Sequence, residues 1–151
     1  MTRNRLILLA AGGSAAMLLG AFFFQMLGYP PCKLCLWQRW PHGAAIAIGA
    51  LAVLTGLRWL PWFGALAALT TGGLGVYHTG VEQGWWKGPT TCTSGDALSS
   101  STGDLLGQIM TAPLVRCDDI AWSFVGLSMA TWNAILSVIL AAIWIAAARR
   151  A

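Results

Sequence analysis

Charged side chains are scarce in this sequence: only 9% of its 151 residues are Asp, Glu, Lys or Arg, whereas 57% are hydrophobic. About a quarter of the residues of a soluble domain are charged, so the composition excludes an ordinary soluble protein and predicts a polytopic membrane protein. The formal charge of +4 does not indicate a nucleic acid partner. Five of the nine cations flank apolar runs, where membrane topology accounts for them; these are Arg3, Arg5, Arg58, Arg149 and Arg150.

Motifs that would indicate common cofactors are also missing. The chain has no Gly-x-Gly-x-x-Gly after a strand, which argues against a dinucleotide site, and no Cys-x-x-Cys-His for haem attachment. It has one Cys-x-x-Cys pair, whereas structural zinc commonly uses two close-spaced pairs. We therefore expect no nucleotide, flavin, haem or resident metal.

Four long apolar runs divide the chain. A helix of about 20 residues, rising about 1.5 Å per residue, crosses the hydrocarbon core of a bilayer. The predicted fold class is all-α, a polytopic membrane four-helix bundle that forms a single domain over residues 1–151. The predicted spans cover residues 6–28, 40–57, 60–80 and 122–148.

The first run resembles a signal peptide in beginning with Arg and apolar residues, but it is too long and lacks a small-x-small cleavage site. We expect it to be uncleaved. Gly12, Ala16 and Gly20 recur every four residues within it. This spacing predicts a face on which a neighbouring helix approaches closely.

The distribution of charge predicts the topology. Four spans place both termini on one side, and the positive-inside tendency makes that side the cytoplasm. All five acidic residues lie between Glu82 and Asp119, within the predicted outer loop at 81–120. All four cysteines fall on the outer side as well, and disulfides persist in oxidising compartments. The outer side is therefore predicted to face a periplasm or its equivalent.

The Cys-x-x-Cys pair stands at the junction of the first two spans. Pro30 and Pro31 cannot continue a helix, so the next helix is predicted to start near Cys35. The N–H groups at a helix N-terminus carry partial positive charge, and Arg39 lies on the same helical face as Cys35. Both features favour a thiolate at Cys35, the form that attacks disulfides and donates electrons.

Three roles are open to the four cysteines. Two disulfides can staple the outer loops, or four thiolates can bind zinc in a tetrahedron. The third role is a redox relay, with one pair at the membrane surface and one on a long loop. The short spacing of Cys32 and Cys35 favours the relay, because such a pair is suited to exchange through mixed disulfides.

Several motifs together resemble the disulfide bond formation protein B (DsbB) family, and the resemblance covers nearly the whole chain. They are Cys32-Lys-Leu-Cys35 with Gln38-Arg39, His78 with Gly80-Val81-Glu82-Gln83-Gly84-Trp85-Trp86, Cys92, Cys117, and Trp122-Ser-Phe124-Val-Gly126-Leu127-Ser-Met129-Ala-Thr-Trp132. The resemblance implies a thiol:quinone oxidoreductase of the bacterial inner membrane. Such an enzyme reoxidises a soluble periplasmic DsbA-like thiol oxidase and passes the electrons to ubiquinone or menaquinone in the lipid bilayer.

The resemblance also implies a role for each cysteine. Cys92 takes the attack of the partner and forms the mixed disulfide. Cys117 is then freed to attack Cys32, and Cys35 is released as a thiolate that faces the quinone. Arg39 stabilises that thiolate and polarises a quinone oxygen; its alternative role is to extend to the lipid headgroups.

Four further residues received weaker assignments. His78 matches the family histidine near the quinone, and Met129 is expected to line the same pocket. His42 has no such match and is interpreted as a helix-start residue near the surface. Gln38 is given little weight.

Two alternative functions stay open at this point. One is a thiol carrier of the same fold that serves a single partner. The other is a non-catalytic membrane protein with structural disulfides or a metal site.

Overall fold

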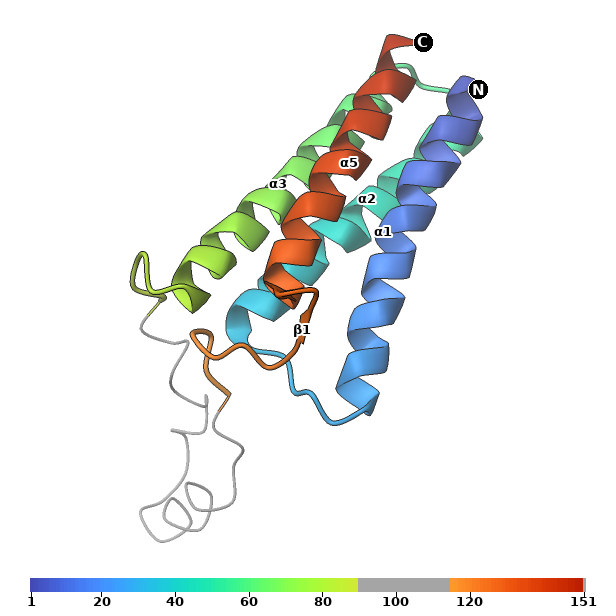
Figure 1. Cartoon of the computed structure of the whole chain (residues 1–151). Coiled ribbons are helices and arrows are strands. Elements are labelled where there is room, and N and C mark those ends of the chain that lie inside the picture. Colours follow the sequence, from blue (N-terminus) through green and yellow to red (C-terminus); the bar gives the residue numbers. More distant parts are fainter. Residues whose placement is uncertain (90–114, 151) are drawn as a thin grey trace, which may run out of the picture.

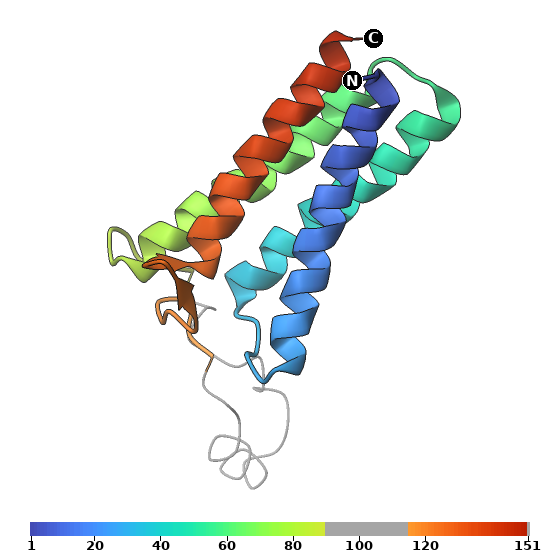
Figure 2. The same ribbon diagram turned by 45° about the vertical axis from the view of Figure 1, so that its right-hand side comes forward.

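Four long helices make up most of the protein in the computed structural model, which describes residues 1–89 and 115–150 (Figure 1). Helices α3 and α5 pack side by side, α2 packs against α3, and α1 packs against α2 and α5 (Figure 2). Both termini lie at the same end of the bundle. The helices are α1 (Arg3–Met26), α2 (Lys33–Thr55), α3 (Leu60–Glu82) and α5 (Met129–Arg149).

The outside of the bundle is apolar. Leu19 is 69% exposed, Leu54 81% and Leu66 60%. Large exposed apolar surfaces mark contact with a partner or a membrane, and α1 and α5 are both long and apolar enough to cross one. The prediction of an all-α four-helix bundle is confirmed.

Helix α2 begins earlier than the sequence predicted. Its first residue is Lys33, two residues before Cys35 and seven before the apolar run at residue 40. The reason is a cap: Cys32 adopts an extended conformation, and its sulfur accepts the backbone N–H of Cys35. A side chain that accepts this N–H satisfies one of the free donors of the first turn. The helix also continues through Pro41.

A short hairpin precedes α5. Its turn consists of Val125 and Gly126, whose φ angles are 54° and 75°, as in the tight two-residue turns that suit the twist of a hairpin. Helix α5 therefore begins at Met129 and not near residue 122, and the Ser128 hydroxyl caps its first turn. The two strands pair antiparallel, β1 being Ser123–Phe124 and β2 Leu127–Ser128.

The small residues of α1 do not form the helix-packing face that their spacing predicted. A methyl group added at Gly12 or Gly20 meets no atom of the described residues within 4 Å. Ala16 and Gly20 line an internal cavity instead. Small side chains here leave space beside α1, and the buried positions of the helix are Leu6, Ile7, Ala10 and Ser14.

At Gly75, α3 packs against the backbone of α5, and this contact provides a stability test. A Cβ atom at this position would lie 2.9 Å from the backbone nitrogen of Ala134 and 3.0 Å from the carbonyl oxygen of Ala130. Gly75→Ala must therefore push the helices apart, and we expect it to lower the free energy of unfolding by about 1–3 kcal/mol. Unfolding in mixed micelles by titration with a denaturing detergent measures the change.

Gly73 is the matched control on the same helix. It is exposed, and an added methyl group there meets no described atom within 4 Å. Gly73→Ala should leave stability unchanged or raise it slightly, because alanine is the better helix former. Equal losses from the two substitutions would contradict the close packing of α3 on α5.

Candidate functional site

Cys32 and Cys35 face each other at the N-terminal end of α2. Both are free thiols, and their Sγ atoms lie 2.6 Å apart. Cys32 is 6% exposed, whereas Cys35 is partly exposed. The pKa of Cys32 is raised because its thiol donates a hydrogen bond to Cys35 and because it is buried. The proton of the pair therefore stays on Cys32, and Cys35 is the sulfur that can carry the negative charge.

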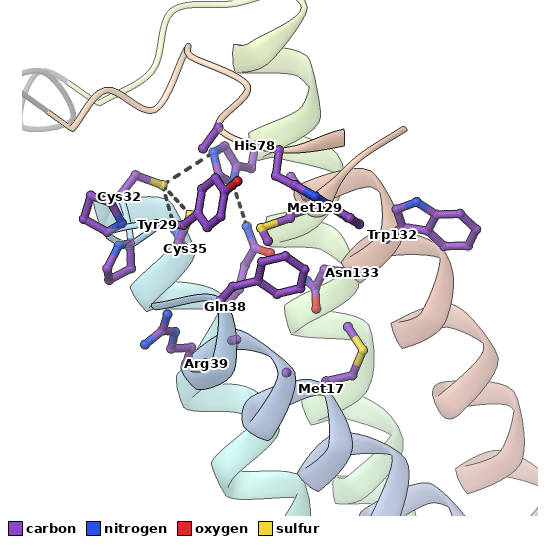
Figure 3. Close-up of a pocket in the computed structure, with 18 of the residues that line it drawn as sticks. Met17, Tyr29, Cys32, Cys35, Gln38, Arg39, His78, Met129, Trp132 and Asn133 are labelled. Atoms are coloured by element: carbon purple, nitrogen blue, oxygen red, sulfur yellow. Dashed lines mark hydrogen bonds between the residues drawn. The ribbon is translucent and has the colours of Figure 1, made fainter. Parts of the chain in front are cut away.

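His78 reaches the cysteine pair from α3. Its Nε2 atom lies 3.6 Å from the Sγ of Cys32, and its ring is buried. On the other side of the ring, the amide nitrogen of Gln38 lies 2.9 Å from Nδ1. In this arrangement Gln38 donates to Nδ1, so Nε2 carries the proton of the neutral ring. His78 thus directs an N–H group toward the Cys32 sulfur (Figure 3).

Glu82 lies one helical turn beyond His78. One carboxylate oxygen is 3.9 Å from Nε2 of His78, and the two side chains are 5% and 4% exposed. The hydroxyl of Ser128 donates to the other carboxylate oxygen. A buried carboxylate is costly unless it is paired or hydrogen-bonded. This group therefore belongs to the polar cluster around the cysteines, although the sequence alone placed it among the acidic residues of the outer loop.

Arg39 crosses from α2 to α1. Its Nη1 atom donates to the Oε1 of Gln25 over 2.9 Å, and its guanidinium carbon lies 5.0 Å from the centroid of the Phe22 ring. The side chain is partly buried and borders the same cavity as Cys35. These contacts hold its charge against α1, at the wall of the cavity that Cys35 also lines.

A cavity of about 470 Å³ lies beside the cysteine pair, within the usual size range of sites for small ligands. Figure 3 shows Cys35, Arg39, His78 and Met129 around it. Most of its wall is apolar. The side chains from α1 and α5 that line it include Ala16, Met17, Ala21, Phe24, Trp132 and Leu136.

His42 is not near the surface, and that interpretation was wrong. It is 3% exposed, and its Nε2 atom lies 2.9 Å from the Oδ1 of Asn133 on α5. Asn133 in turn donates to the carbonyl and hydroxyl oxygens of Thr71 on α3. The Thr71 hydroxyl donates to the carbonyl of Gln38 over 3.0 Å. Because α2 starts at Lys33, His42 lies well inside the bundle, where it joins three helices.

Cys117 packs directly beside the pair. It is 1% exposed, it is disulfide-bonded, and it shares a buried cluster with Cys32, Leu34 and Val81. The backbone of Cys117 also hydrogen-bonds to His78. The fourth predicted cysteine, Cys92, lies outside the described residues. So does the short helix that a cap at Thr102 suggested.

The structure brings most of the predicted site residues together. Cys32, Cys35, Arg39, His78 and Met129 all border the cavity. Sequence reasoning missed three others that do so, namely Gln38, Glu82 and His42. Gln38 carried a usable signal, since an uncharged polar residue three positions after Cys35 lies on the cysteine side of the helix.

Comparison with known proteins gives a consistent result. The sequence model of the family described as Disulfide bond formation protein DsbB matches residues 3–147. Among curated proteins, the chain is 29% identical to Disulfide bond formation protein B of Paracidovorax citrulli, over 92% of this chain and 82% of that protein. It is 30% identical to the protein of the same name in Verminephrobacter eiseniae, over 87% and 77% of the two chains. It is 27% identical to Disulfide bond formation protein B of an Acidovorax species, over 87% of this chain and 78% of that protein. No solved structure matches the chain with significance.

Proposed function

This chain belongs to the DsbB family of disulfide bond formation proteins, and from that premise we propose that it transfers electrons from a soluble DsbA-like thiol oxidase to a membrane quinone. Membership makes it a disulfide-generating oxidoreductase with a helical membrane fold. The proposal adds the partner, the quinone and the roles of individual residues. It also places the chain in the bacterial inner membrane, with both termini in the cytoplasm and the cysteines in the periplasm.

One observation carries the proposal: the free Cys32–Cys35 pair opens onto an apolar cavity whose wall also includes the positively charged side chain of Arg39. Cys35 and Arg39 line the same space, and Cys35 is the more exposed of the two sulfurs. A purely structural role does not need free thiols at a cavity wall.

The residues of this cavity fit a quinone head group. Its apolar wall suits a lipid-soluble ring, and the Arg39 guanidinium supplies a hydrogen-bond donor for a carbonyl oxygen. When bound, ubiquinone or menaquinone supplies a two-electron, two-proton acceptor. Arg39 would stabilise the Cys35 thiolate, and the His78 N–H would orient the sulfur of Cys32. Met129 would contribute to the apolar wall.

The position of Cys117 supports the second half of the proposed relay. Its place in the buried cluster with Cys32 favours direct exchange between these two sulfurs. We propose that Cys117 is bonded to Cys92, and that a thiolate of the partner attacks the Cys92 sulfur, breaks this disulfide and releases Cys117 as a thiolate. Cys117 then bonds to Cys32, which breaks the oxidised Cys32–Cys35 bond and leaves Cys35 with the electron pair.

A coupled assay tests this function. Purified protein, reduced partner and ubiquinone are mixed, and we expect one quinone to be reduced for each disulfide formed in the partner. Arg39→Gln should slow quinone reduction by about 100-fold, the cost of losing one preorganised electrostatic contact in an active site. Absorbance follows the quinone, and thiol titration follows the partner.

Arg58→Gln is the control, because this cation lies in the short connection between α2 and α3, at the opposite end of α2 from the cysteines. It should turn over at the wild-type rate. A partner that is oxidised without loss of quinone would refute the proposed acceptor, and equal rates for Arg39→Gln and wild type would refute the role of Arg39.

A further inference from the structure

We propose that the reduced Cys32–Cys35 pair and His78 form a reversible zinc site, and that bound zinc blocks electron transfer. The three ligand atoms, two Sγ and one imidazole nitrogen, all lie within 4.8 Å of one another. Zinc binding stands on this geometry alone. Only its inhibitory consequence rests on the proposed function.

The spacing of sulfur and nitrogen suits a tetrahedral zinc ion. With Zn–S near 2.3 Å and Zn–N near 2.1 Å, the two ligand atoms lie about 3.6 Å apart. Cys32 Sγ and His78 Nε2 are 3.6 Å apart here. Two zinc-bound sulfurs lie about 3.8 Å apart, whereas those of Cys32 and Cys35 are separated by 2.6 Å. A rotation of the Cys35 side chain opens this distance, and Cys35 is the less buried of the two residues.

Gln38 can switch His78 into the form that binds metal. As it stands, the Gln38 amide nitrogen faces Nδ1 and leaves the proton on Nε2. A half-turn of the amide presents its oxygen instead, so that Nδ1 donates and Nε2 has a free lone pair. Zinc-bound histidines commonly donate their second nitrogen in this way.

Glu82 lies next to this ligand set but outside it. Its carboxylate oxygen is 3.9 Å from His78 Nε2 and is nearly as buried as the ring, but it is not among the ligand atoms that lie within 4.8 Å of one another. Water is therefore the expected fourth ligand, as in other zinc sites with three protein ligands. Two thiolates and an imidazole are established zinc ligands.

Zinc and the disulfide compete for the same two sulfurs. Binding of Zn²⁺ to the dithiol forms two Zn–S bonds and releases two protons, with no electron transferred. While the metal holds both sulfurs, they cannot bond to each other or give up electrons. The oxidised pair offers no thiolate, so zinc should bind the reduced protein alone.

Zinc binding is measured on quinone-free protein in detergent. The protein is reduced with a phosphine, freed of reductant, and titrated with Zn²⁺ against a chromophoric chelator. We expect one zinc per chain in the reduced protein and none after oxidation with diamide. Co²⁺ in place of zinc should give the intense absorption of a tetrahedral site with thiolate ligands.

Three variants sharpen the test. His78→Gln should weaken zinc binding at least 10-fold, and Glu82→Gln should weaken it less, since the carboxylate lies outside the ligand set. Arg58→Gln, in the short connection at the opposite end of α2, should bind zinc as the wild type does.

The possible outcomes separate this proposal from the proposed function. Equal zinc binding by His78→Gln and wild type, or by oxidised and reduced protein, overturns the zinc site whatever the quinone assay shows. If zinc binds as expected but quinone reduction continues unchanged in the zinc-loaded protein, the inhibitory role is overturned. A wild-type protein that binds zinc and never reduces quinone overturns the proposed function instead.

Discussion

Cys35→Ser is expected to abolish quinone reduction, whether the electrons come from the soluble partner or from dithiothreitol. Burial raises the pKa of the Cys32 thiol and persists when the hydrogen bond to the Cys35 sulfur is lost, so Cys32 does not replace Cys35 as the electron donor. A serine hydroxyl cannot form the disulfide by which two electrons leave the pair. The absorbance of ubiquinone measures the loss directly.

Cys32→Ser provides the comparison that separates the two sulfurs. It also prevents turnover, because no second sulfur remains to form the bond. It should nevertheless retain a Cys35 thiolate next to the cavity, and with added quinone this thiolate should give a visible charge-transfer band. Cys35→Ser should show no such band. A band of equal strength in both variants would mean that Cys35 is not the sulfur against the quinone.

The architecture of this chain was largely predictable because the hydrophobic runs are long and nearly free of charge. Errors arose where polar chemistry sets the boundary of a helix. The run at residue 40 marks where α2 becomes apolar, but the helix begins at Lys33 because the Cys32 sulfur caps it. Likewise, the apolar residues after 120 include a hairpin, because Val125 and Gly126 adopt the positive φ angles of a tight turn. Helix α5 therefore begins only at Met129.

The candidate site was predictable where its residues are neighbours along the chain. Cys35 and Arg39 are four positions apart, so helical periodicity placed them on one face. Contacts between helices depend on how far one helix is shifted along the next, and the hydrophobic periodicity of a single helix does not give this register. The family resemblance assigned His78 to the surroundings of the quinone, and its approach to Cys32 was not predicted. The burial of Glu82 beside His78 was missed, because a single glutamate at the end of an apolar run has the pattern of a loop residue.

Burial also changes how a polar residue should be interpreted. His42 and Gln38 were judged as single side chains and received little weight. In the bundle, each has partners on other helices: Asn133 bonds to His42, and His78 bonds to Gln38. Polar groups inside a membrane bundle are costly unless paired, which makes them informative about function. A sequence shows the polar residue but not its partner.

Cys92→Ser is expected to stop oxidation of the soluble partner while leaving quinone reduction by dithiothreitol intact. Cys117 is 1% exposed and packs beside Cys32, so its sulfur is poorly accessible to a folded protein. In the proposed relay the partner attacks Cys92, the role that the family resemblance implies. Dithiothreitol is small enough to reduce the Cys32–Cys35 bond directly through the partly exposed Cys35. Parallel assays with the two electron donors measure the difference.

A trapped intermediate identifies the attacked sulfur in the unmodified protein. A partner that retains only its attacking cysteine should break the disulfide at Cys92, form a stable mixed disulfide there, and leave the electron pair on Cys117. Proteolysis and mass spectrometry then locate the linked peptide. Linkage through Cys117 or Cys35 would show that electrons arrive elsewhere. In the proposed relay Cys117 next exchanges with Cys32. Cys117→Ser should therefore also stop oxidation of the partner and leave quinone reduction by dithiothreitol intact. Cys35→Ser should stop quinone reduction by either electron donor.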